Sequence, residues 1–190
     1  MATTTTRRRA AALPPDERRS MIIEATIPLL LELGDMVTTR QIADAAGIAE
    51  GTIFRAFADK DELLAAVIEA AIDPAPLERA LETIDPSLSL VEIIERATEV
   101  SQRRVVEIWR LVTSVGTRFH NHARGPMSES LALTRLFEAH RAELAVSPQH
   151  AARTLRAFVF AMSHPMMVEK PAPPLEIAEV FLHGVAKKNA

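Results

Sequence analysis

Hydrophobic residues recur every three or four positions along most of this 190-residue chain, which is the spacing of helices that bury one face. A half-buried strand would alternate apolar and polar residues over a run rich in Val, Ile and Thr, and no such run is sustained here. The pattern therefore predicts an all-α protein.

Residues that start and stop helices divide this pattern into separate elements. Thr38 with Gln41, and Ser89 with Glu92, have the spacing of a capping box, in which two residues satisfy each other's free amides at a helix start. Gly47 is placed to end a helix. Besides a short helix that follows Gly47, these signals predict helices over the ranges 15–33, 38–47, 59–72, 76–84, 89–116, 128–145, 147–164 and 174–187.

Two prolines within Asp73-Pro74-Ala75-Pro76 interrupt the helical spacing, and we place a domain boundary there. The predicted organisation is a disordered basic arm over residues 1–15, a small domain over 16–73 and a larger helical domain over 74–190. The arm carries Arg7, Arg8 and Arg9.

Residues 38–57 are spaced as two short helices joined by a glycine turn. Gly47 can adopt a positive φ at little cost, which allows a tight turn. Small residues at Ala43 and Ala46 let the two helices meet closely, and the small core between them is filled by Ile42, Ile48 and Ile53. This is the spacing of a helix-turn-helix, whose second helix enters the major groove of DNA. The sequence therefore predicts a DNA-binding protein.

The exposed face of that second helix supplies the candidate base contacts. Arg55 suits guanine or phosphate, Thr52 suits a base, a phosphate or a thymine methyl, and Gly51 lets the helix approach the groove closely. Residues at the starts of the neighbouring helices are placed to hold flanking phosphates. The predicted DNA-binding residues are Thr39, Arg40, Ala49, Glu50, Gly51, Thr52, Phe54, Arg55 and Lys60.

Over about residues 18–72 the chain resembles the DNA-binding domain of the TetR/AcrR family of bacterial transcriptional regulators. The matching residues are Thr39, Ile42-Ala43, Ala46-Gly47-Ile48, Gly51-Thr52-Ile53-Phe54, Phe57 and Lys60-Asp61-Glu62-Leu63. The resemblance implies a three-helix helix-turn-helix domain at 16–73, followed by an effector-binding and dimerisation domain at 74–190. It further implies a homodimeric regulator, more often a repressor, that a small molecule releases from a palindromic operator.

Two departures from the family pattern bear on DNA affinity. Ala49 stands where Ser or Thr commonly caps the recognition helix, at a cost of about 1 kcal/mol. Phe54 stands where Tyr is common, so a phosphate-bonding hydroxyl worth roughly 0.5–1.5 kcal/mol is missing. DNA contact is therefore expected to depend on Arg55, Arg40, Lys60 and the basic arm.

The larger domain has apolar residues suited to two further roles, and each residue is equally consistent with a plain core. A cavity for a small-molecule effector between helices would use large apolar side chains; the candidates are Trp109, Val112, Phe119, Met127, Phe137, Phe158 and Met162. A helix-turn-helix protein gains specificity by pairing two recognition helices, and the resemblance places the dimer in the last two helices. The predicted interface is Ala151, Leu155, Phe158, Val159, Met162, Ile177, Val180, Phe181 and Val185.

Charge alone argues against nucleic acid. The net charge is −3, and residues 1–73 hold 8 Lys and Arg against 12 Asp and Glu, a local net of −4. Phosphate binding depends on where the cations lie, so the DNA interpretation rests on the motif. The alternative is a helical ligand-binding or scaffold protein whose DNA binding has weakened or been lost.

Other function classes find no support in the sequence. The chain has no cysteine, which removes disulfides, thiolate nucleophiles and Cys-based metal sites. His120 and His122 lie two residues apart without a nearby Cys or paired carboxylate, so no metal is expected. No catalytic motif and no cofactor site is recognisable. Without an apolar run of about 18 residues or a secretory signal, we expect a cytoplasmic protein that is not an enzyme.

Overall fold

The computed structural model describes residues 14–116 and 128–185, and all regular elements within them are helices. The chain divides into two compact units, Met1–Val67 and Ile68–Ala190, and each is described by itself. The division falls inside one helix, whereas the predicted boundary lies at the helix break after residue 72. The predicted basic arm lies outside the described residues up to residue 13, and its last position, Pro15, is the first residue of a helix.

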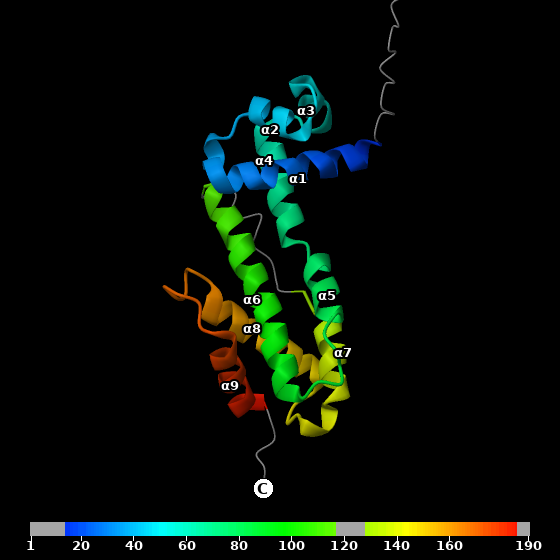
Figure 1. The fold of residues 1–190 in the computed structure, drawn as a ribbon, viewed down its shortest axis with the longest axis vertical. Helices are drawn as coiled ribbons and strands as arrows, with labels where there is room; N and C mark the ends of the chain where they lie inside the picture. The colour runs from blue at the N-terminus through cyan, green and yellow to red at the C-terminus, as the bar shows by residue number, and fades with distance from the viewer. Residues whose placement is uncertain (1–13, 117–127, 186–190) are drawn as a thin grey trace, which may run out of the picture. The chain divides into compact units, whose positions relative to one another are not determined.

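The N-terminal unit contains the predicted helix-turn-helix (Figure 1). Its elements are α1 (Pro15–Leu33), the 3₁₀ turn η1 (Gly34–Met36), α2 (Thr39–Ala46), α3 (Glu50–Ala56) and the first part of α4 (Lys60–Ile72). Both α1 and α3 pack against α2. The apolar side chains buried here include Ile22, Leu30, Val37, Ile42, Ala43, Ile53, Phe57 and Leu63.

The C-terminal unit is a helical bundle around one long helix (Figure 1). Its elements are α5 (Ala75–Glu82), α6 (Leu90–Ser114), α7 (Leu131–Ala139), the 3₁₀ turn η3 (Arg141–Glu143), α8 (Pro148–Ser163) and α9 (Pro174–Val185). The long helix α6 packs against α5, α7, α8 and α9. Side chains from all five helices form a single core.

Local capping explains why the long helix begins where it does. The Ser89 hydroxyl accepts a hydrogen bond from the Glu92 amide at 3.4 Å, and the Glu92 carboxylate accepts from the Ser89 amide at 2.9 Å. The Ser89 hydroxyl also donates to the Glu92 carboxylate, at 2.6 Å, and this bond together with that from the Ser89 amide lowers the pKa of Glu92, because both favour its charged form. The capping box predicted from sequence is confirmed.

The helix predicted over 128–145 is shorter in the structure. It begins at Leu131, where the Ser130 hydroxyl accepts from the Leu133 amide and the Glu78 carboxylate accepts from the Ala132 amide. It ends at Ala139, and a 3₁₀ turn follows in which Nδ1 of His140 lies 2.7 Å from a Glu143 carboxylate oxygen. Hydrophobic residues keep their helical spacing through this turn. The sequence pattern therefore did not indicate that the helix ends at Ala139.

The length and hydrophobicity of the helices show whether any of them could cross a membrane. Within the described ranges, no helix combines the length and the apolar character that crossing a bilayer requires.

Candidate nucleic-acid interface

The turn between α2 and α3 is built as the sequence predicts. Thr38 and Gln41 form a capping box at the start of α2, and Gly47 ends it with φ 66° and ψ 32°. The Gly47 amide donates to the carbonyl of Asp44, and the Ile48 amide donates to that of Ala43. These bonds satisfy carbonyls that the helix end would leave free, so the turn is fixed by backbone contacts.

Helix α3 presents one face to its own unit and the other to solvent. Ile53 of α3 is fully buried, and Phe57, the extended residue that follows the helix, is 2% exposed. Gly51 and Arg55 are exposed, and Phe54 is 51% exposed despite its apolar ring. A Cβ added at Gly51 would have no protein atom within 4 Å. The outer face of α3 is therefore open space that a partner can enter.

The end of α3 is held by Arg19, a residue that the sequence analysis did not single out. The Arg19 guanidinium donates to the carbonyl of Ala56, the last residue of α3. It also lies 4.1 Å from the centroid of the Phe57 ring and forms a 3.3 Å ion pair with Glu62. One side chain of α1 thus ties together the end of α3 and the start of α4. No local signal marks it, because its partners are distant in sequence.

Two predicted phosphate-binding residues already have partners. The Thr39 hydroxyl donates to the Glu50 carboxylate at 2.5 Å, and it has only one hydrogen to give. The Lys60 ammonium donates to the carbonyl of Asp35. To donate to a phosphate, the Thr39 hydroxyl must first release the Glu50 carboxylate. The Lys60 ammonium can offer a phosphate only the hydrogens that the Asp35 carbonyl does not use.

The start of α4, expected to hold a phosphate with its free amides, is occupied by carboxylates. An Asp59 oxygen accepts from the Glu62 amide at 2.8 Å, and a Glu62 oxygen accepts from the Ala58 amide at 2.6 Å. Negative charge at this position favours the helix and disfavours a phosphate. The exposed cations left on this unit include Arg40 on α2 and Arg55 on α3, whereas the Lys60 side chain is half-buried.

Comparison with known proteins agrees with this geometry. The model of the bacterial regulatory proteins of the TetR family matches residues 22–67, which cover most of α1, all of α2 and α3, and the first part of α4. Residues 22–67 therefore form a domain of the TetR family of bacterial regulatory proteins. No curated protein matches the chain at a significant level.

Solved structures resemble the chain over both units. A TetR-family transcriptional regulator from Pectobacterium atrosepticum is 19% identical, with a TM-score of 0.66, and the match covers 93% of this chain and 97% of that one. A putative TetR-family regulator from Mesorhizobium loti is 15% identical, with a TM-score of 0.64, covering 93% and 100%. The flavonoid-responsive regulator FrrA is 23% identical, with a TM-score of 0.54, covering 92% and 100%. At these identities the likeness establishes the fold.

The residues predicted to line an effector cavity have varied surroundings in the C-terminal unit. Phe119 and Met127 lie outside the described residues. Phe137 is fully buried and stacks on Phe181 at 5.9 Å between ring centroids, and Phe158 meets the same ring edge-on at 6.4 Å. Met162 packs against this core, and Val112 is 1% exposed. These residues are part of the packed interior.

Trp109 belongs to a separate aromatic cluster. Its ring lies 4.2 Å from that of His164, which also lies 4.5 Å from the Phe160 ring. Nδ1 of His164 accepts a hydrogen bond from the Met166 amide, so the neutral ring carries its proton on Nε2. Burial lowers the pKa of His164 because it disfavours the charged imidazolium.

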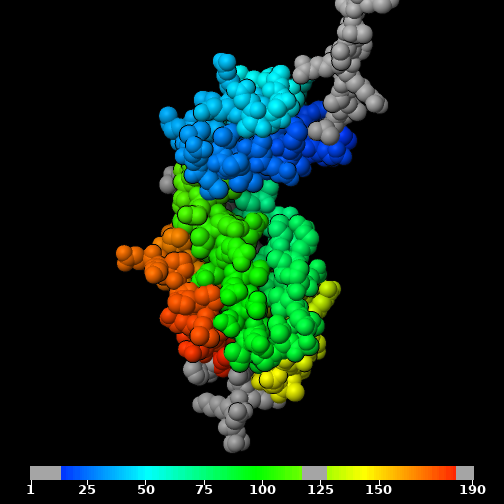
Figure 2. Space-filling view, viewed as in Figure 1, coloured from blue at the N-terminus to red at the C-terminus, as the bar shows by residue number. Residues whose placement is uncertain are grey.

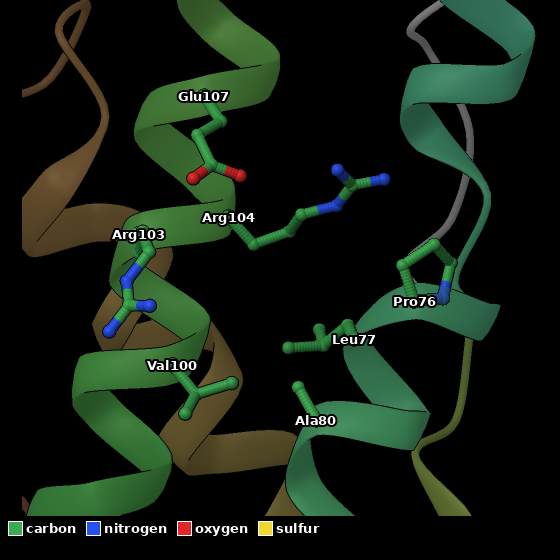
Figure 3. A pocket seen from close by; sticks show the side chains of 7 residues that line it. All are labelled: Pro76, Leu77, Ala80, Val100, Arg103, Arg104 and Glu107. Carbon is green, nitrogen blue, oxygen red and sulfur yellow. The ribbon is translucent and has the colours of Figure 1, made fainter. Parts of the chain in front are cut away.

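Two hollows lie along α6, and neither is lined by the predicted cavity residues. One, of about 250 Å³, lies between α5 and α6 and is lined by Pro76, Leu77, Ala80, Val100, Arg103, Arg104 and Glu107 (Figure 3). The other, of about 580 Å³, lies between α6 and the start of α9 and is lined by Glu99, Gln102, Arg103, Val106, Glu107, Arg110, Pro171 and Pro174. Arginines contribute to both.

Five residues of the predicted dimer interface are buried inside the protomer. Side chains at most 1% exposed have no surface to offer a second copy in this conformation; among the predicted residues these are Ala151, Leu155, Val159, Ile177 and Phe181. Phe158 and Met162 are half-buried against the same core, and the side chain of Val185 lies outside the description. Only Val180, 41% exposed, points clearly outward. The apolar stripes of α8 and α9 build the protomer's own core.

We expect Arg19→Ala to lower the free energy of unfolding by about 1–3 kcal/mol, because it removes a hydrogen bond to α3 and the contact of a cation with an aromatic ring. Chemical denaturation followed by far-ultraviolet circular dichroism measures this change. The control is Arg40→Ala, an exposed arginine of the same unit, which should change stability by less than about 0.5 kcal/mol. Equal effects of the two substitutions would contradict the role given to Arg19.

Proposed function

We propose that this TetR-family protein is a homodimeric transcriptional repressor that binds a partly palindromic operator through α3 and leaves it when a small-molecule effector binds the C-terminal unit. The open face of α3 carries the proposal. Gly51 is the second residue of α3, and a Cβ there would meet no atom within 4 Å beyond its chain neighbours and the helix's own backbone, so a base-pair edge can approach closely. Arg55 lies exposed one helical turn further on.

The side chains on this face offer complementary chemistry to a major groove. Arg55 suits guanine or phosphate as a charged donor, and the exposed Phe54 ring suits a thymine methyl group. Glu50 is an acceptor, held at the start of α3 by Thr39, and the exocyclic amine of cytosine is a donor in that groove. The exposed face of α3 is therefore suited to contacts with particular bases rather than with the phosphate backbone alone.

The negative charge of the N-terminal unit makes contacts with particular bases more important for DNA affinity. The N-terminal 73 residues carry a net charge of −4, so general attraction to DNA is weak. The exposed Arg40 and Arg55 offset part of this negative charge on α2 and α3. We therefore expect specific operator binding that weakens as salt rises, together with weak binding to non-specific DNA.

Pairing of two protomers fits the outward faces of α8 and α9. Exposed apolar residues on and between these helices are Phe160, Met166, Met167, Leu175 and Val180. The segment that joins the helices, orange in Figure 2, stands out from this face of the molecule and carries both methionines. Arg153 is exposed on α8, and Glu176 and Glu179 are exposed on α9, so the two helices offer opposite charges to one another across a twofold axis.

Release by a small molecule requires that the molecule bind the two conformations of the protein with different affinity. The name of one structural relative, the flavonoid-responsive regulator FrrA, describes such a response for that protein. The C-terminal unit offers hollows along α6 as candidate sites. If an effector molecule binds there and operator affinity stays unchanged, release by a small molecule is contradicted.

We predict that Arg55→Ala lowers operator affinity roughly 5- to 100-fold, because a charge-assisted contact is lost, and reduces the slope of log affinity against log salt by about one if that contact is to phosphate. Fluorescence anisotropy with labelled operator at several salt concentrations measures both quantities. Arg79→Ala is the matched control, since Arg79 is an exposed arginine on α5 in the other unit.

The control should bind the operator as the unaltered protein does. A scaffold protein without DNA function would bind its partner equally well in both variants. It would bind operator no more tightly than scrambled DNA. If Arg55→Ala binds operator as tightly as Arg79→Ala, α3 is not the reading element.

A second prediction concerns the dimer. Phe160→Glu combined with Val180→Glu should convert the protein from dimer to monomer, because charges would have to be buried without partners. Sedimentation velocity at micromolar concentration reads the mass directly. The matched control places the same two charges on exposed apolar residues elsewhere, Val91→Glu with Leu131→Glu, and should stay dimeric. A monomeric unaltered protein, or a dimeric double variant at 160 and 180, would refute this interface.

A further inference from the structure

The hollow between α5 and α6 combines an apolar floor with a cationic rim (Figure 3). Pro76, Leu77 and Ala80 of α5 face Val100 of α6 across it. The rim is formed by three charged residues of α6, namely Arg103, Arg104 and Glu107. Such a lining suits a ligand with an apolar part and one charged end.

Arg104 reaches from α6 across the hollow toward the segment that enters α5 (Figure 3). Its Nη2 donates to the carbonyl of Ala71, in the last turn of α4, and to that of Asp73 at 3.4 Å. Its Nε is buried and has no hydrogen-bond partner. The side chain is half-buried, and in the described part of the chain no carboxylate pairs with it. The guanidinium thus has two neutral partners and donors to spare.

A half-buried cation without a counter-ion attracts an anion, because pairing recovers part of the cost of removing the charge from water. Glu107 on the rim opposes this attraction, and Arg103 supports it. Both are exposed, so water screens their charges more strongly than that of Arg104. Two arginines and one glutamate leave the rim with a net positive charge.

Size limits the ligand further. A volume of about 250 Å³ holds roughly eight groups the size of a water molecule. A carboxylate supplies acceptor oxygens for the Arg104 hydrogens that the two carbonyls leave unused, and a short hydrocarbon chain covers the apolar floor.

We propose that this hollow binds a small monocarboxylate with a short apolar chain, whose carboxylate pairs with the donors of Arg104 that the two carbonyls leave unused. Binding changes the tie between α6 and the end of α4, and α4 contributes to both compact units. This assignment gives the chemical class of the effector, and only its regulatory consequence rests on the proposed function.

Isothermal titration calorimetry on the full-length protein tests the site with three probes. Hexanoate should bind saturably and at least tenfold more tightly than hexanamide, which lacks the charge, and than acetate, which lacks the chain. Arg104→Gln should weaken hexanoate at least tenfold. The control Arg96→Gln alters an exposed arginine of α6 outside the hollow and should stay within twofold. Equal binding of hexanoate and hexanamide, or no binding of hexanoate, would overturn the proposal.

Arg104 also holds the end of α4, so a second variant separates binding from stability. Ala80→Leu fills the hollow from α5 and leaves Arg104 in place. It should lose hexanoate binding at least tenfold, with an unchanged circular dichroism spectrum. Full binding by a folded Ala80→Leu protein would place the ligand elsewhere.

The regulatory consequence has its own measurement. Hexanoate should lower operator affinity of the unaltered protein and leave that of Arg104→Gln unchanged. If hexanoate binds and operator affinity stays constant, the effector role is wrong and the binding site stands. If no DNA is bound specifically, the proposed function fails, and the calorimetric result still decides the site.

Discussion

The placement of α3 depends on contacts that α3 does not itself supply. A helix of seven residues without a side-chain cap is not stable alone. Ile53 and Phe57 anchor its inner face, and Arg19 holds its last carbonyl while lying over the Phe57 ring. Because these contacts occupy only one side, the other side can remain open around Gly51. A reading helix of this length is rigid only as part of its unit.

Long cationic side chains hold carbonyls near both ends of α4. Lys60, its first residue, donates to the carbonyl of Asp35 in the N-terminal unit, and Arg104 donates to that of Ala71 in the C-terminal unit. Hydrogen bonds of this kind are worth about 1.5–3 kcal/mol each. A carboxylate that binds the remaining donors of Arg104 acts on the same guanidinium that holds Ala71. This arrangement gives the proposed effector a physical route to the helix that both units share.

The sequence predicted what local chemistry decides. The capping boxes at Thr38 and Ser89 and the turn at Gly47 involve residues within a few positions of each other, and all three are present. Arg19 and Arg104 escaped prediction because they bind backbone carbonyls far away in the chain, which leave no mark in side-chain spacing. The apolar stripes of α8 and α9 were visible, and periodicity cannot tell whether a stripe meets its own core or a second copy.

The central claim is that α3 reads DNA by close approach at Gly51. The most direct test compares the unaltered protein with Gly51→Ala, by fluorescence anisotropy on DNA flanking its own gene with scrambled competitor. A Cβ at this position meets no protein atom, so folding should be unharmed or stabilised by about 0.5–1 kcal/mol. The unaltered protein should bind in the presence of competitor, with an affinity that weakens as salt rises and that is at least tenfold lower in the variant. Equal operator affinity of the two proteins would contradict it.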